Sequence, residues 1–261
     1  MPVRPTTVSK PLNIYKIEIN KGALDALPTD VRRNFLLFGH IANEINTLYR
    51  LLIFSIKEQS NDVMKLFAES RSFTIARLLI GTTQEGYVAL NKHVLSQKFG
   101  HTYLPLLNAK GQAALKRVRK HLSDMELMAS IRNNFAFHHP TSAQIDNAYA
   151  RIPHDSDMSI YSGTPRHSSL YTMSLNLMTQ GILDCLNDPE DKLSHADAMG
   201  QIMDDVINKS TDLNDFIEAL LGTIAEREKL SPHPLSNSNI VLTVDGHESM
   251  TSFAIPPLLR T

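Results

Sequence analysis

Apolar residues recur at spacings of three and four over long stretches of the chain, which predicts amphipathic helices. The first predicted helix spans about residues 30 to 58, and a second spans about 62 to 96, where Gly81 and Gly86 are possible kinks. The apolar stripe of the first helix consists of Phe38, Ile41, Ile45, Leu48 and Leu52. A stripe confined to one face is typical of a helix in a bundle.

Shorter elements follow in the middle of the chain. The segment KFGHTYLPLLNAKG, residues 98 to 111, has the composition of a loop, and a third helix is expected at about 111 to 121. Ser123 and Glu126 then stand three residues apart, which is the spacing of a capping box at a helix start. We therefore expect a helix from about residue 124 to His138, ended by Pro140.

The remaining residues predict further amphipathic helices and a few short strands. Helices are expected at about 167 to 187, 193 to 208 and 212 to 229. Alternating segments predict strands at 13 to 20, 158 to 163 and 239 to 244, and the last either pairs with the first or forms a loose tail. The fold class is therefore all-α: an up-and-down helical bundle with additional C-terminal helices and minor peripheral β strands.

The domain organisation follows from the same pattern. We expect residues 1–261 to form a single domain with a helical core at 30–150 and additional helices at 160–230. Residues 231–261 are expected to be an extension or tail.

Composition narrows the class of protein. The chain is 42% hydrophobic, and its apolar runs are shorter than the roughly 20 residues that span a bilayer. Its amino terminus lacks the apolar region of a secretory signal, so we expect a cytoplasmic protein without a membrane partner. The one cysteine, Cys185, lies in an apolar helical pattern and is interpreted as a structural thiol.

One segment, IRNNFAFHHP, concentrates chemically active side chains at a predicted helix end. Arg132 and Asn133 come first, and His138 and His139 follow just before Pro140. In a straight helix, at roughly 100° per residue, His139 shares the direction of Arg132, whereas His138 is turned away by about 120°. Spacing alone leaves a second interpretation open, in which the polar side chains are solvated or cap the last carbonyls.

The same string resembles the signature of the HEPN superfamily (higher eukaryotes and prokaryotes nucleotide-binding). That signature is an arginine, often followed by asparagine, then four to six residues and a histidine. Many members have the form R-N-x-x-A-F-H after an aliphatic residue, which Ile131, Arg132, Asn133, Ala136, Phe137 and His138 match. The resemblance covers about residues 30 to 150. A variant with a tyrosine shortly after the histidine is absent, and this chain encodes no nucleotidyltransferase partner.

The resemblance implies a metal-independent endoribonuclease that requires no cofactor. Cleavage through the RNA 2′-hydroxyl needs a proton acceptor, a proton donor and positive charge at the phosphorane. In this interpretation Arg132 binds the phosphate, and His138 exchanges protons. Asn133 orients the site by a hydrogen bond from its amide to the histidine or to a neighbouring backbone group. His139 is the reserve candidate for proton exchange because the helical phase favours it. The family usually pools two motifs across a dimer, so we expect a homodimer, and a toxin-like or antiviral role is implied.

A basic cluster precedes the motif in an otherwise neutral chain of net charge −1. Lys116, Arg117, Arg119 and Lys120 lie at the end of a predicted helix and are candidate RNA-binding residues. The other explanation is that these cations complement the helix dipole.

Two other functions are compatible with the sequence. The chain could be a non-catalytic HEPN-like module that binds RNA, nucleotides or a protein, or a structural helical protein in which the motif merely ends a helix. No spacing of histidines or acidic residues predicts a metal site, so no metal is expected.

Overall fold

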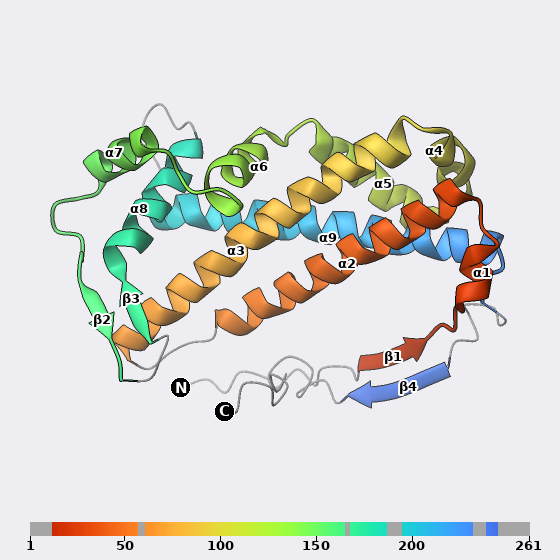
Figure 1. Cartoon of the computed structure of the whole chain (residues 1–261), viewed down its shortest axis with the longest axis horizontal. Helices are drawn as coiled ribbons and strands as arrows, with labels where there is room; N and C mark the ends of the chain where they lie inside the picture. Colours follow the sequence, from red (N-terminus) through yellow and green to blue (C-terminus); the bar gives the residue numbers. More distant parts are fainter. Residues whose placement is uncertain (1–11, 57–60, 165–167, 187–194, 232–238, 245–261) are drawn as a thin grey trace, which may run out of the picture. The chain divides into compact units, whose positions relative to one another are not determined.

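The computed structural model describes residues 12–56, 61–164, 168–186, 195–231 and 239–244. Most of these residues are helical, and the few strands form small antiparallel pairs, which confirms the predicted all-α class with minor strands (Figure 1). The chain divides into two compact units. One comprises Met1–Arg32 with Ile224–Thr261, and the other comprises Arg33–Thr223.

The smaller unit contains the pairing that was proposed between the two ends of the sequence. Strand β1, Leu12–Lys16, pairs antiparallel with β4, Asn239–Val244, so that Leu12 lies opposite Val244. The register shifts between Ile14 and Tyr15. Helix α1, Lys21–Asp25, follows β1 and is capped by the side chain of Asn20.

The core of the larger unit is formed by long helices that pack closely. These are α2 (Thr29–Ser55), α3 (Asp62–Leu90) and α9 (His195–Arg227). At Gly86 of α3, a Cβ would come within 2.7 Å of Leu213 on α9 and 3.1 Å of Ile41 on α2. The predicted position of a kink is therefore a position where α3 meets both neighbours.

Helix α9 is continuous where two helices were predicted, so the break at residues 208–212 was wrong. The polar run there contains Lys209 and Ser210, whose side chains are buried. Because these polar groups are hydrogen-bonded inside the protein, the helix continues across the polar run. The buried apolar face therefore extends from Val206 to Leu213 without a break in the helix.

The shorter elements of the larger unit differ from prediction in several places. They are η1 (Asn91–Leu95), α4 (Lys98–Tyr103), η2 (Leu104–Leu106), α5 (Ala109–Leu122), α6 (Glu126–Ile131), η3 (Arg132–Ala136), α7 (Ser142–Arg151), β2 (Ile160–Ser162), β3 (Ser169–Tyr171), α8 (Thr172–Leu183) and η4 (Asp184–Leu186). The predicted loop at 98–111 was wrong, because buried Phe99 and Tyr103 anchor α4 through a ring contact at 4.9 Å.

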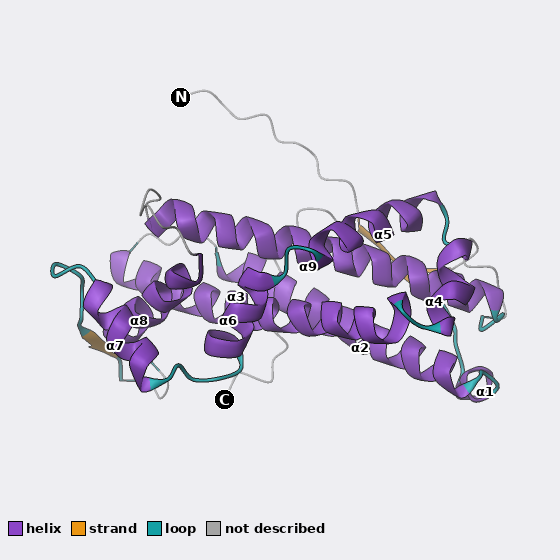
Figure 2. Cartoon of the chain, turned by 90° about the horizontal axis from the view of Figure 1, so that it is seen from above, coloured by secondary structure: helices purple, strands orange, loops and turns teal. Residues whose placement is uncertain are grey.

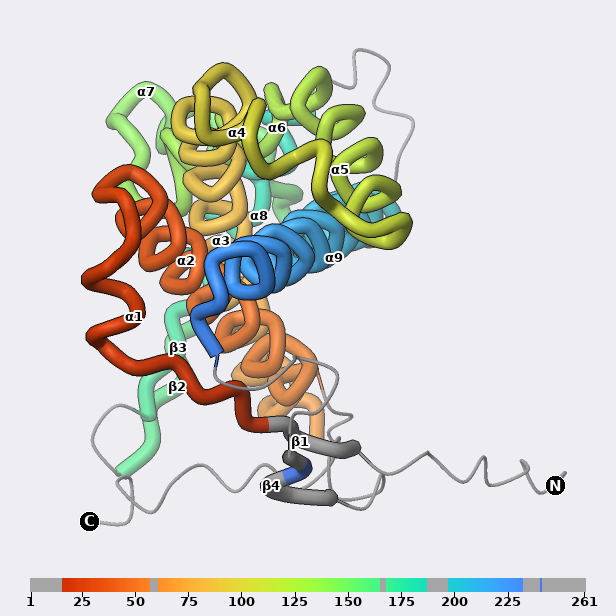
Figure 3. Tube along the Cα trace, turned by 90° about the vertical axis from the view of Figure 1, so that its right-hand side faces the viewer, coloured from red at the N-terminus to blue at the C-terminus, as the bar shows by residue number. Residues whose placement is uncertain are grey.

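The predicted capping box was also wrong. Ser123 ends α5, where its hydroxyl donates to the carbonyl of Lys120 at 2.7 Å, and α6 starts after Met125 without a side-chain cap. A true capping box opens α7 instead, between Thr141 and Gln144. Figure 2 and Figure 3 show α5 lying alongside α9, and a Cβ at Gly111 would come within 2.9 Å of Ala219.

Two glycines offer a test of this packing with opposite expected signs. A Cβ at Gly100 would lie 2.0 Å from the backbone oxygen of Val94, whereas a Cβ at Gly39 would meet no described residue within 4 Å. Gly100→Ala should therefore lower the free energy of unfolding by about 1–3 kcal/mol, because the backbone must move. Gly39→Ala, inside α2, should raise it by about 0.5–1 kcal/mol. Urea denaturation measures both, and equal effects would contradict the packing.

None of the described helices combines the length and the apolar character that a bilayer crossing requires.

Candidate functional site

The motif lies at the end of α6, where the helix widens and stops. After Ile131 the chain takes one π-helical turn, in which the N–H of Phe137 donates to the carbonyl of Arg132 at 3.5 Å. The predicted α-helix to His138 was therefore wrong in its last turns. Pro140 follows and has no N–H that could continue the helix.

Two glycines on neighbouring helices fix the position of this turn. A Cβ at Gly81 of α3 would lie 2.7 Å from the ring of Phe137, and one at Gly181 of α8 would lie 2.5 Å from the ring of Phe135. The two aromatic rings therefore pack directly on the backbone of the flanking helices at two buried glycines. The π turn is held between α3 and α8 as a result.

Arg132 is engaged by a carboxylate and an amide. Its guanidinium forms an ion pair with Glu85 of α3 and donates to the side-chain oxygen of Asn133 at 2.7 Å. Its Nε atom is buried and finds no hydrogen-bond partner within the residues that the structure describes. Glu85 was not singled out in the sequence, where an isolated acidic residue 47 positions before the motif gives no signal.

His138 and His139 lie beyond the helix and are exposed. Among the described residues, no hydrogen bond joins either imidazole to Arg132. The helical phase that favoured His139 does not apply, because the helix ends at Ala136 and Phe137 is its C-cap. The geometry of a single chain thus brings Arg132 and Asn133 together and leaves both histidines open to solvent.

The surroundings of the motif are partly apolar. On α3, Leu78, Glu85 and Val88 are exposed and fall on one side of the helix by their spacing. Phe137 is 46% exposed although its ring packs on Gly81. We call the surface formed by Leu78, Glu85, Val88, Arg132 and Phe137 the motif face.

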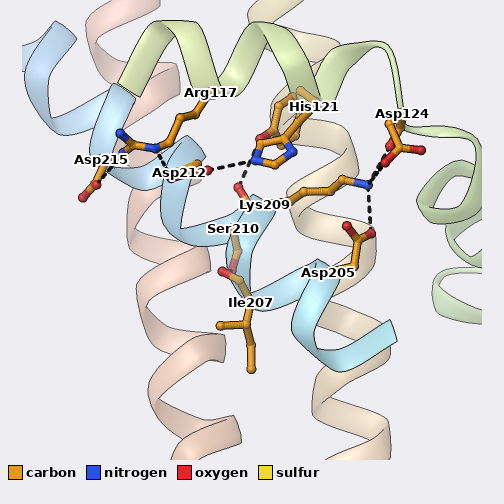
Figure 4. A network of polar contacts seen from close by, with 10 residues as sticks. Arg117, His121, Asp124, Asp205, Ile207, Lys209, Ser210, Asp212 and Asp215 are labelled. Carbon is orange, nitrogen blue, oxygen red and sulfur yellow. Dashed lines mark hydrogen bonds and ion pairs between the residues drawn. The ribbon is translucent and has the colours of Figure 1, made fainter. Parts of the chain in front are cut away.

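The basic cluster on α5 is divided by its contacts (Figure 4). Arg117 donates to Asp212 at 2.5 Å and to Asp215 at 3.1 Å, both on α9. These carboxylates raise the pKa of Arg117, chiefly through the hydrogen bond that Arg117 donates to Asp212. Lys116, Arg119 and Lys120 are exposed. Three of the four candidate RNA-binding residues therefore point to solvent, and one is committed to α9.

A buried lysine lies close to this cluster (Figure 4). The ammonium of Lys209, whose side chain is 1% exposed, donates to the backbone oxygen of Asp124 at 2.6 Å and to Asp205 at 2.8 Å. The hydroxyl of Tyr87 donates to the carbonyl of Lys209 at 3.2 Å, and burial raises the pKa of that phenol. This site could not be found from the sequence, because a lysine in a polar run of a helix is usually exposed.

On the α8 side of the π turn lies a polar cavity of about 280 Å³. Its lining consists of Glu126, Ser130, Asn134, Phe135, Gln144, Asn147, Gly181, Asp184 and Cys185. Cys185 is half-buried, and Ser130 donates to its sulfur at 3.3 Å. Burial raises the pKa of this thiol, as expected for a structural cysteine. Within the described ranges, no three His, Cys, Asp or Glu side chains are placed to hold a metal ion.

Comparisons with protein-family models, with curated proteins and with solved structures find no significant match to this chain.

Proposed function

We propose that this protein is a metal-independent endoribonuclease whose active site is built from the motif at the end of α6. The observation that carries the proposal is the arrangement of the motif. A guanidinium held by Glu85 and Asn133 lies a few residues before two exposed imidazoles. The match of this segment to the HEPN signature supports the same assignment, and in that family such activity accompanies toxin-like or antiviral roles.

The residues suit in-line cleavage of RNA. An imidazole would take the proton of the 2′-hydroxyl, and the resulting oxygen would attack the adjacent phosphorus and break the bond to the 5′ oxygen. A protonated imidazole would give its proton to that leaving oxygen, which yields a 2′,3′-cyclic phosphate and a 5′-hydroxyl. Arg132 would stabilise the charge on the phosphorane.

A homodimer would supply the acid and the base together. One chain offers a single His138, and its exposed position leaves room for a second copy. The exposed Leu78, Val88 and Phe137 give the motif face an apolar character suited to self-association. In a symmetric pair that buries this face, two copies of the motif would border one cleft.

A second candidate function is favoured by the ion pair between Arg132 and Glu85. An arginine already matched by a carboxylate is partly neutralised, and a phosphate would have to compete with Glu85 for it. In that case the motif would stabilise the helix end, and the protein would be a non-catalytic RNA-binding or nucleotide-binding module.

Incubation with RNA in EDTA separates the two functions. Purified protein should release fragments that end in 2′,3′-cyclic phosphate, and Arg132→Ala should slow their release roughly 100- to 1,000-fold, because the phosphorane charge loses its partner. Arg33→Ala, at an exposed arginine of α2, is the matched control and should retain full activity. RNA that stays intact at high protein concentration but is bound would support the binding module.

A further inference from the structure

A second cavity, of about 210 Å³, lies between α3 and the segment from β3 to α8. Its polar lining consists of one guanidinium, that of Arg77, and several hydroxyl groups, among them those of Ser70, Thr74 and Ser174. Two aromatic residues, Phe73 and Tyr171, and three other apolar ones complete the lining.

Arg77 is a half-buried cation without a carboxylate partner among the described residues. One of its nitrogens donates to the backbone oxygen of Phe135 at 3.0 Å, and its buried Nε atom has no hydrogen-bond partner in the described part of the chain. Burial lowers the pKa of Arg77, which reflects the cost of removing its charge from water. A half-buried guanidinium without a carboxylate partner is suited to bind an anion, and its forked donors match the oxygens of a phosphate.

The aromatic residues add a surface for a base. The guanidinium carbon of Arg77 lies 5.4 Å from the ring centre of Phe73, so the cation and the ring form a cation–π pair. Tyr171 lines the same cavity and is 54% exposed, which leaves its ring available for stacking. The hydroxyls of Ser70, Thr74 and Ser174 can exchange hydrogen bonds with a ribose or a phosphate.

Contacts along α3 place this cavity relative to the motif. Glu85 pairs with Arg132, Gly81 packs against Phe137, and Arg77 reaches the carbonyl of Phe135. Arg132 thus lies beside Glu85, whereas the last residues of the π turn lie beside the earlier positions of α3, Gly81 and Arg77. Arg77 lines the cavity and ties it to the motif by a direct hydrogen bond.

We propose that Arg77, Phe73 and Tyr171 form a binding subsite for one nucleotide of single-stranded RNA, with the phosphate on Arg77 and the base against Tyr171. The inference rests on the proposed ribonuclease function and names the form of its substrate. A base that stacks on an exposed ring must be unpaired, so a duplex would not fit. Arg77 and Tyr171 would bind the strand and would not take part in proton transfer.

Binding of a fluorescent single-stranded RNA, followed by anisotropy, tests the subsite. All variants carry His138→Ala so that the probe stays intact. Arg77→Gln should weaken binding roughly tenfold or more, because a charge-assisted hydrogen bond to phosphate is lost. The slope of log affinity against log salt concentration should also fall by about 0.7. Tyr171→Ala should weaken binding roughly tenfold and leave that slope unchanged.

Controls separate the subsite from general effects. Arg33→Gln removes an equal charge from an exposed position of α2 and should bind RNA like the parent. Arg77→Lys keeps the charge but loses the fork, so it should keep the salt slope and bind with intermediate affinity. Tyr171→Ala keeps the proposal testable if Arg77→Gln disturbs the fold. Tyr171 is half-exposed, whereas Arg77 hydrogen-bonds the last turn of the motif helix.

Each outcome bears on a different proposal. RNA affinities of Arg77→Gln and Tyr171→Ala equal to that of Arg33→Gln would overturn the subsite and leave the ribonuclease proposal standing. RNA that binds through Arg77 but is never cleaved by the protein with His138 intact would support the subsite and overturn the ribonuclease. Displacement of the probe by adenosine monophosphate at equal concentration would assign the site to free nucleotides and overturn RNA as its ligand. No RNA binding by the parent would overturn both.

Discussion

His138→Ala is expected to slow RNA cleavage by roughly 100- to 10,000-fold, whereas His139→Ala should retain most of the activity. Both imidazoles are exposed and lie beyond the helix, so neither is selected by its direction relative to Arg132. What distinguishes them is the match to the HEPN signature, which places the histidine at position 138. Rates of release of 2′,3′-cyclic phosphate in EDTA measure the difference.

Mixed dimers provide the control for this result. Unsubstituted and His138→Ala chains can be co-expressed with different tags and purified together as mixed dimers. If the two copies of His138 supply the acid and the base of one cleft, a mixed dimer lacks one of them and should have far less than half of the activity of the unsubstituted dimer. Equal losses for His138→Ala and His139→Ala would contradict the assignment of His138. Mixed dimers with half of the unsubstituted activity would show that each chain acts alone and would contradict the shared cleft.

Lys209→Ala is expected to lower the free energy of unfolding by about 3–5 kcal/mol, which is a large fraction of the stability of a typical domain. The substitution leaves the backbone oxygen of Asp124 and the carboxylate of Asp205 without the ammonium, and it empties the volume of a fully buried side chain. Urea denaturation followed by circular dichroism gives the change.

One further variant separates the lost hydrogen bonds from the lost volume, and a second is the control. Lys209→Met keeps most of the buried stem and should cost about 1–3 kcal/mol, the part that belongs to the lost hydrogen bonds. Lys110→Ala, at an exposed lysine of α5, should change stability by less than about 0.5 kcal/mol. A loss for Lys209→Ala as small as that for Lys110→Ala would show that the buried ammonium contributes nothing to the fold.

The long helices could be predicted from the sequence because their apolar stripes extend over many turns. The stripe that contains Phe38, Ile45 and Leu52 predicted a helix close to the observed bounds of α2. Each of these three residues is buried, as the stripe requires. Alternation also predicted both strands β1 and β4, but it left open whether they pair, and the structure shows that they do. Patterns of this kind depend on local periodicity, which the sequence carries directly.

Features that depend on distant partners could not be predicted. Lys209 falls in a polar run that predicts a helix break, and its hydrogen bond to Asp124, 85 positions away, cannot be read from that run. Helix α7 was missed because its ten residues bury little beyond Ala148 and show no long stripe. At the site, the motif residues were found from their order, whereas Glu85 and Arg77 were not, because they meet the motif only through the packing of α3.

The point at which the motif helix ends has a consequence for the spacing of its residues. Inside a helix, one inserted or deleted residue swings every later side chain by about 100° around the axis. His138 follows the C-cap Phe137 and is free of this rule. The number of residues between the arginine and the histidine can then vary by one or two without sending the imidazole to the opposite side. Tolerance of such length changes is what a signature with four to six intervening residues requires.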